Sequence, residues 1–311
     1  VPDSFTHGTG FFKGLNKLEI WEKNKWDLSN VPENEERELF ETFYENSWVN
    51  QLCKNHLTDF TPINFGLSGR GNRAALKELY LHPELNIESA KEKIVIYMLT
   101  GYERFDFVNK DYEVGHHKFN TMWPTTDCGN NLRTLGNEYM EHVWSDRMGL
   151  IELLLNIAEV KNWCKVHNAK FILTSAFTPT INKQFITDHI IGDLLYGKES
   201  HVEKLVNIID WDEFFYPDGF RCITDYLLSL ENRTDLINEF SSWNYYKFAY
   251  EHKKMTPNGY ITKCAHPSDD GHKEIAKLLY EHIKNKIKPF LKTWLTVYAC
   301  AMKKTTAWWP I

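Results

Sequence analysis

The sequence predicts an α/β fold in which helices cover a parallel sheet. Two short runs, at 92–100 and 170–177, are almost wholly apolar or β-branched. The first ends at Gly101 and the second shortly before Pro179, as strands buried on both faces do. Segments with helical periodicity lie between and beside these runs. Strand, helix and strand therefore alternate along the chain, which is typical of a parallel sheet.

Four strands and three helices of the α/β unit are expected, and a further helix is expected at 188–195. The strands are placed, in chain order, at 61–68, 92–100, 170–177 and 206–215. The helices, recognised by apolar residues at a spacing of three to four, are placed at 71–80, 148–167 and 270–290.

The domain organisation is interpreted as one domain over 1–291 with two large insertions. The insertions lie around 106–147 and 178–260, and the second contains a long aromatic segment at 243–250. Neither has an internal repeat or a Gly/Ser linker, so both are expected to cap a sheet edge or roof a pocket. Residues 292–311 form a C-terminal extension of unknown role.

Charge and composition argue against a nucleic-acid-binding protein, a membrane protein and a zinc or redox protein. The net charge of -6 argues against a nucleic-acid partner, because phosphate binding needs a concentrated basic surface. The one basic stretch, 284–292, is interpreted as the solvated face of a helix. No segment approaches a membrane span, and six scattered cysteines without a Cys-x-x-Cys pair support neither a zinc nor a redox site. Reduced thiols in a cytoplasmic setting are the default expectation.

Three clusters carry residue types that suit ester hydrolysis. Ser4 follows Asp3 and precedes a helix-forming stretch, which suits a nucleophile at an exposed turn, although an ordinary helix N-cap has the same pattern. Glycines within 64–72 (NFGLSGRGN) leave backbone N–H groups free to face a cleft, although a tight turn uses glycine equally well. His266 precedes Pro267 just before the last predicted helix, where a loop histidine can face a nucleophile.

Together these clusters resemble blocks I, II and V of the SGNH (GDSL-like) hydrolase family. The matching segments are the Asp-Ser pair at 3–4, the Asn-x-x-x-Ser-Gly segment at 64–69 and the His-Pro loop at 266–267. Their order and wide separation match as well. The Thr-Gly-x-x-Arg segment at 100–104 is most similar to divergent members from phages and environmental sequences.

The resemblance implies a flavodoxin-like three-layer α/β/α fold and hydrolysis of an ester through an acyl-enzyme. Ser4 would be the nucleophile, and its own N–H would be one oxyanion donor. Gly69 would give the second donor through its backbone N–H. His266 would take the serine proton and return it to the leaving alcohol. The implied substrate is a small-molecule or carbohydrate acyl ester, and neither a cofactor nor a metal is implied.

Two departures from the family pattern concern blocks I and III. Pro2 stands where block I has glycine, and the strand-like run 295–301 is a speculative candidate for the first strand. No asparagine follows the buried strand at 92–100, so Tyr102 or Arg104 is the candidate third oxyanion donor. Arg104 could equally form a structural ion pair.

The third departure concerns the acid of the triad. The position three residues before His266 is Lys263. An Asp-x-x-His sequence does occur at Asp269 and His272, but His272 is expected to lie in the first turn of the helix and to hold the loop. We therefore expect a Ser4–His266 dyad, or an acid supplied from elsewhere in the chain.

Two functions remain open from the sequence. The leading one is a carboxylesterase or acetylesterase, with insertion aromatics lining a sugar or acyl site unless they serve packing alone. These aromatics are Trp123, Trp243, Tyr245 and Tyr246. The alternative is a non-catalytic binding or structural protein on the same fold. It is supported by the family residues that this sequence lacks in blocks I and III and at the triad acid. The sequence does not predict an oligomeric state.

Overall fold

The computed structural model describes residues that cover most of the central part of the chain. They are 41–42, 44–66, 71–81, 85, 93–102, 104–108, 119–122, 138–139, 141–176, 183–184, 186, 201–211, 214–237, 259–261 and 266–287. Ser4, Gly69 and Lys263 lie outside them, as do 188–195, 243–250 and 292–311.

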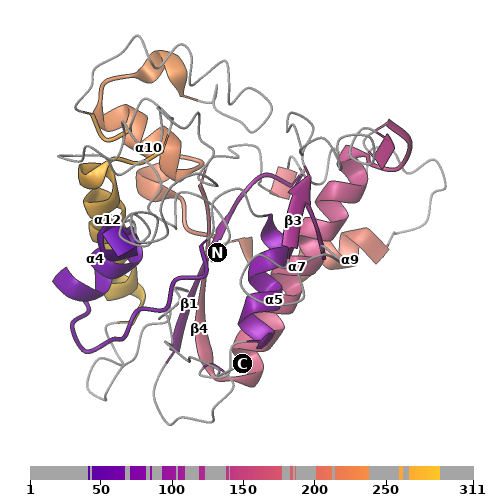
Figure 1. Ribbon diagram of the computed structural model, residues 1–311, viewed down its shortest axis with the longest axis horizontal. Coiled ribbons are helices and arrows are strands. Elements are labelled where there is room, and N and C mark those ends of the chain that lie inside the picture. Colours follow the sequence, from indigo (N-terminus) through magenta and orange to yellow (C-terminus); the bar gives the residue numbers. More distant parts are fainter. Residues whose placement is uncertain are drawn as a thin grey trace, which may run out of the picture.

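The described chain contains both helices and strands (Figure 1). The strands are β1 (Lys93–Leu99), β2 (Phe105–Val108), β3 (Phe119–Met122) and β4 (Ala169–Ser175). The α-helices are α4 (Trp48–Asn55), α5 (Asn72–Leu81), α7 (Asp146–Val166), α9 (His201–Ile208), α10 (Ile223–Leu230) and α12 (Asp269–Ile287). Two 3₁₀ turns are η2 (Pro217–Gly219) and η3 (Thr234–Leu236).

A parallel pair of strands, β1 and β4, lies at the centre of the described structure. Their register runs from Lys93 opposite Ala169 to Leu99 opposite Ser175. Every residue of β1 is buried, so both faces of the strand are covered. The strands predicted at 92–100 and 170–177 are therefore confirmed, and the α/β class with them.

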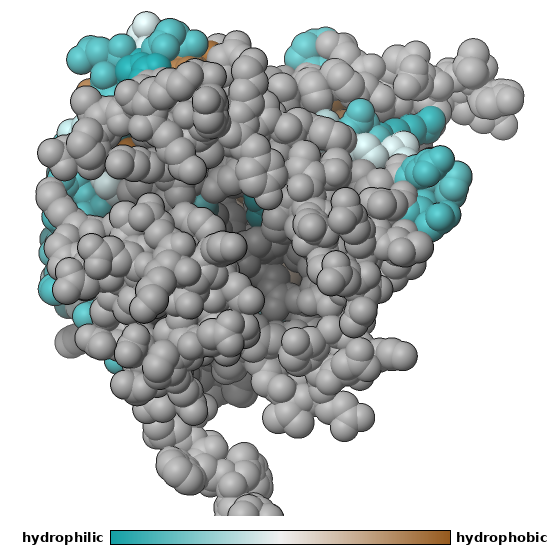
Figure 2. Space-filling view, turned by 45° about the horizontal axis from the view of Figure 1, so that its top comes forward, coloured by the Kyte–Doolittle hydropathy of each residue, from teal (hydrophilic) through white to brown (hydrophobic). Residues whose placement is uncertain are grey.

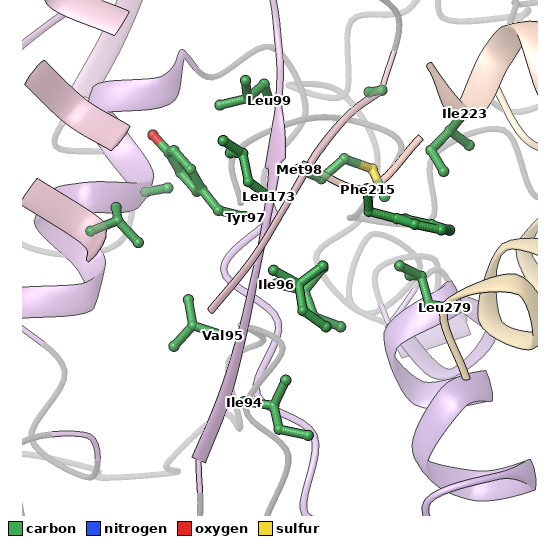
Figure 3. Close-up of a cluster of buried hydrophobic side chains, with 14 of the residues drawn as sticks. Ile94, Val95, Ile96, Tyr97, Met98, Leu99, Leu173, Phe215, Ile223 and Leu279 are labelled. Carbon is green, nitrogen blue, oxygen red and sulfur yellow. The ribbon is translucent and has the colours of Figure 1, made fainter. Parts of the chain in front are cut away.

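Side chains of β1 point alternately to the two sides of the sheet (Figure 3). Val95 and Tyr97 point toward the side of α5, and the Tyr97 hydroxyl donates to the carbonyl oxygen of Asn72 at 2.9 Å. Ile96 points to the other side, where Leu279 of α12 lies. This period of two follows from the pleat of a strand, and here it places apolar residues in a core on each side.

Helices stand on both sides of these strands, with α5 and α7 on one side and α4 and α12 on the other (Figure 1). The helices α5 and α7 run side by side in the same direction: Arg73 lies 4.0 Å from Glu152, and one to two turns further the Tyr80 hydroxyl donates to Glu159 at 2.5 Å. The helices predicted at 71–80, 148–167 and 270–290 correspond to α5, α7 and α12, and each is confirmed.

The residues at the two ends of α7 explain where this helix begins and ends. The Ser145 side chain accepts a hydrogen bond from the Met148 N–H at 3.2 Å, which caps the first turn two residues earlier than predicted. At the other end Asn168 adopts φ of 50°, a left-handed conformation that asparagine tolerates better than most residues. The chain can therefore turn directly from α7 into β4.

The strand predicted at 206–215 is wrong for most of its length. Val206 and Ile208 belong to the end of α9. Among the described residues of this range, the pairing with β4 is a parallel bridge between Phe214 and Leu173, with the Phe215 N–H donating to the Leu173 carbonyl oxygen. Val206 and Ile209 are buried whereas Ile208 is 52% exposed. Burial at a spacing of three is the helical pattern, which the dense apolar run concealed.

The strand predicted at 61–68 is confirmed only as a short bridge at Asn64 and Phe65, within its described part. The two stretches predicted to be insertions contain helices and strands of their own. The first includes the antiparallel pair of β2 and β3, with Phe105 opposite Met122, and the second includes α9 and α10.

On the face seen in Figure 2 the coloured residues are mostly hydrophilic. Among the helices of the described residues, none is long and apolar enough to cross a membrane.

Three cysteines within the described part, Cys53, Cys164 and Cys222, are free and buried. Burial raises the pKa of Cys53 and of Cys164 to about 12, so both remain thiols at neutral pH.

Stability should depend on the protonation of His282 in α12. Its ring lies 4.2 Å from the Phe215 ring, and burial, with a smaller contribution from Lys286, lowers its pKa from 6.5 to about 4. Between these values the unfolded chain binds a proton that the folded chain does not, so stability is fully present above about pH 6.5 and falls as the pH drops toward 4. We expect His282→Phe to make urea unfolding less sensitive to pH over this window.

The matched control is Leu155→Phe, which places a phenylalanine at a 47% exposed position without removing a titratable group. This variant should follow the wild-type pH dependence. Parallel pH curves for wild type and His282→Phe would show that His282 does not contribute to the acid sensitivity.

Candidate functional site

His266 lies in the loop that leads into α12 and is buried, with 8% of its surface exposed. Pro267 forms an antiparallel bridge with Ile261. The N–H of Ser268 donates to the carbonyl oxygen of Tyr260 at 2.7 Å. The two residues that follow the histidine are therefore held by the chain around Tyr260, and the imidazole projects from a backbone with little freedom.

The residues after His266 build the start of α12. The Ser268 side chain accepts a hydrogen bond from the Gly271 N–H at 3.1 Å, the bond expected of an N-cap. A Cβ on Gly271 would overlap the carbonyl oxygen of Tyr260, so only glycine allows this close approach. The pattern Ser-x-x-Gly thus fixes both the helix start and its distance from the neighbouring segment.

His272 lies in the first turn of α12, as expected, and is fully buried. Its Nδ1 accepts a hydrogen bond from the backbone N–H of Trp48 at 3.2 Å. Because Nδ1 accepts, the proton of the neutral ring lies on Nε2. The Trp48 N–H stands at the start of α4, where helical amides have no partner within the helix. His272 therefore caps α4 and joins it to α12.

The glycine-rich segment is anchored at both described ends. At its beginning, the Asn64 side-chain oxygen accepts the Gly66 N–H at 3.0 Å. At its end, the Asp106 carboxylate accepts the N–H groups of Gly71 at 2.9 Å and Ala74 at 2.8 Å. Gly71 thus occupies the cap position of α5, and Asp106 supplies from another part of the chain the acceptor that glycine lacks.

Asp106 is almost completely buried, with 2% of its surface exposed. A Cβ on Gly71 would lie 2.6 Å from a carboxylate oxygen of Asp106, so glycine leaves the room that the carboxylate fills. Burial raises the pKa of Tyr97, and the Asp106 charge raises it further. Hydrogen bonds from the helix N-terminus stabilise such a buried carboxylate, and Asp106 in turn anchors the start of α5.

Asn72 joins the start of α5 to the carboxyl end of β1. Its side-chain oxygen accepts the Thr100 N–H at 3.0 Å, and its amide group donates to the carbonyl oxygens of Thr100 at 3.2 Å and Gly101 at 3.4 Å. The residues that follow Arg70 in the sequence are therefore fixed to the end of a central strand. In parallel sheets this edge is where ligands bind.

Tyr102 and Arg104 follow β1, as the sequence placed them. The Tyr102 hydroxyl donates to Asp146 in the first turn of α7 at 3.2 Å. Gly149 of α7 also packs closely on Tyr102, because a Cβ there would lie 2.8 Å from the Tyr102 carbonyl oxygen. These contacts favour a structural role for Tyr102. The Arg104 N–H donates to the carbonyl oxygen of Gly101 at 3.4 Å, which closes a turn after the strand.

The second insertion brings a buried carboxylate that sequence reasoning missed. Asp225 in the first turn of α10 is 1% exposed, and its N–H donates to the Cys222 sulfur at 3.5 Å. Burial, and after it the Asp225 charge, raises the pKa of Cys222. Thr224 bonds to the Ala176 carbonyl oxygen directly after β4, so α10 begins at the carboxyl end of that strand. An aspartate three residues after a cysteine carried no recognisable signal.

The separation of Ser4 from His266 stays a prediction, because Ser4 lies outside the described residues. The same holds for Gly69 and for Lys263. The insertion aromatics Trp123, Trp243, Tyr245 and Tyr246 also lie outside them.

Within the described part of the chain, no group of three or more His, Cys, Asp or Glu side chains could hold a metal ion. Comparison with family models, with curated proteins and with solved structures finds no match to this chain.

Loss of the Asp106 carboxylate should destabilise the fold. Asp106→Ala leaves the Gly71 and Ala74 amides buried without their acceptor, which typically costs about 1–3 kcal/mol. Glu152→Ala is the matched control, because Glu152 is a surface carboxylate in a 4.0 Å ion pair, and such pairs are worth about 0–1 kcal/mol. Urea unfolding measures both. Equal losses in the two variants would contradict the anchoring role of Asp106.

Proposed function

We propose that the chain is a serine ester hydrolase of the SGNH type, built on a flavodoxin-like three-layer fold. The fold is supported by the parallel pair of β1 and β4, with α5 and α7 on one side and α4 and α12 on the other. The substrate is an acyl ester of a small molecule or carbohydrate.

The observation that carries the proposal is the setting of His266. It is a buried imidazole directly before a helix, and the following residues are held by the Pro267–Ile261 bridge, by the Ser268 cap and by the close approach at Gly271. A general base needs such a fixed position, because misplacement of about 1 Å can cost 10²-fold in rate. The segment that leads to Gly69 is similarly anchored at its described ends, by Asn64 and Asp106.

The proposed mechanism has two steps. In the first, His266 removes the Ser4 proton while the Ser4 oxygen attacks the ester carbonyl carbon, and the N–H groups of Ser4 and Gly69 stabilise the oxyanion. His266 then returns the proton to the leaving alcohol, and an acyl-enzyme forms. In the second, His266 activates a water molecule that attacks the acyl group, which releases the acid and restores the Ser4 hydroxyl.

Ser4→Ala tests the proposal on a short-chain chromogenic ester. Removing the nucleophile should lower kcat by roughly 10³-fold or more, because the acyl-enzyme can no longer form. Ser145→Ala is the matched control, because the Ser145 side chain caps α7 by accepting the Met148 N–H and has no part in the proposed chemistry. This variant should retain wild-type kcat. Undiminished hydrolysis in Ser4→Ala would overturn the role of Ser4 as nucleophile. No hydrolysis by the wild type would favour a non-catalytic binding or structural protein.

Lys263→Asp tests whether the triad lacks its acid. A carboxylate three residues before His266 would accept a hydrogen bond from the Nδ1–H. Such a charge-assisted hydrogen bond is worth roughly 1.5–3 kcal/mol, so kcat should rise about tenfold or more. Asp269→Asn is the comparison, and it should change kcat little because the Asp269 carboxylate pairs with Lys273 at 2.8 Å. A neutral Lys263→Asp together with a large loss in Asp269→Asn would show that Asp269 is the acid.

A further inference from the structure

Glu231, at the C-terminal end of α10, contacts the segment 259–261, which pairs with the residues that follow His266. The Glu231 carboxylate accepts the N–H of Ile261 at 2.8 Å. It also fills the space beside Gly259, where any Cβ would overlap it. A charge-assisted hydrogen bond from a backbone amide is stronger than a neutral one, so this contact holds the segment firmly.

The anchored segment pairs directly with the residues that follow His266. Ile261, whose N–H the Glu231 carboxylate accepts, forms the antiparallel bridge with Pro267. The neighbouring Tyr260 carbonyl accepts the Ser268 N–H. Glu231 is therefore connected to the backbone of His266 through one hydrogen bond, one bridge and one peptide bond.

The other end of α10 is fixed to the central strands. The Thr224 N–H and hydroxyl both bond to the Ala176 carbonyl oxygen, at 3.0 and 2.8 Å, directly after β4. In the middle of the helix the Tyr226 hydroxyl donates to Glu274 of α12 at 2.9 Å. A helix of eight residues spans about 12 Å, so α10 is a short strut between the end of β4 and the His266 loop.

We propose that Glu231 is a positioning residue for His266, and that α10 holds the imidazole at a fixed place relative to the end of β4. The proposal rests on the proposed hydrolase function for its kinetic consequences. The second insertion is then part of the catalytic framework rather than only a cover over it. Glu231 acts through Ile261 and Pro267 and does not itself contact the substrate.

Two substitutions at Glu231 test the proposal, with a neighbouring carboxylate as control. Glu231→Ala removes the acceptor for the Ile261 N–H, whereas Glu231→Gln keeps an oxygen acceptor of nearly the same shape. The control is Asp235→Ala, because the Asp235 side chain is 62% exposed and forms an ion pair with Arg233 in the same region of the chain.

Kinetics on the chromogenic ester provide the first measurement. Glu231→Ala should lower kcat roughly 10- to 100-fold with little change in KM. It should also shift the midpoint of the limb of the kcat/KM pH profile that reports the proposed base, His266. Glu231→Gln should recover most of the lost kcat, and Asp235→Ala should match the wild type. An unchanged kcat in Glu231→Ala, or equal losses in the Ala and Gln variants, would overturn the proposal.

Nuclear magnetic resonance separates this proposal from the proposed function. In Glu231→Ala, but not in Asp235→Ala, the His266 ring resonances should shift and the Ile261 amide should exchange faster with solvent. If the wild type hydrolyses no ester, the proposed function fails, and these signals alone decide whether Glu231 positions His266. Unmoved His266 resonances in Glu231→Ala would overturn the positioning role whether or not the wild type is active.

Discussion

The described structure depends on the parallel pairing of β1 with β4, which is buried on both sides. Because Lys93 through Leu99 are all buried, neither face of β1 can be left to solvent, and each needs a layer of helices. The helix α7 leads into β4 through the turn at Asn168, so it must return along the sheet. The positions of α5 and α12 then follow from the apolar surfaces that remain to be covered.

Polar side chains join the loops at the ends of this core to distant parts of the chain. Asp106 accepts amides at the start of α5, Glu231 accepts an amide beside the His266 loop, and His272 accepts the first amide of α4. In each case a backbone N–H that needs a partner obtains it from a residue far away in sequence. Buried amides left unpaired would be costly, so these contacts determine the loops as strongly as the apolar core determines the helices.

The sequence predicted the elements whose signal is local. The apolar runs of β1 and β4 and the periodicity of α7 and α12 depend on neighbouring residues, and their positions agree with the structure to within a few residues. The error at 206–215 arose because a dense apolar run hid a helical spacing that only the exposure of Ile208 reveals. The setting of His266 directly before a helix was likewise a local inference, from His-Pro and the helical residues after it.

Long-range contacts could not be predicted in this way. Asp106 is 35 residues from Gly71, Glu231 is 30 from Ile261, and Thr224 is 48 from the Ala176 carbonyl that it binds. Nothing in residue type or spacing joins these partners, because their contact exists only after the chain has folded. The roles of Ser4 and Gly69 came from resemblance and stay predictions.

The glycines beside the two anchoring carboxylates have a consequence for how the sequence can vary. Gly71 and Asp106 share one small volume, as do Gly259 and Glu231, since the carboxylate occupies the place of a Cβ. Enlarging either glycine expels the carboxylate, whereas shortening the acid creates space that alanine could fill. Substitutions at the two members of a pair should therefore be strongly non-additive, and in related chains the two positions should change together.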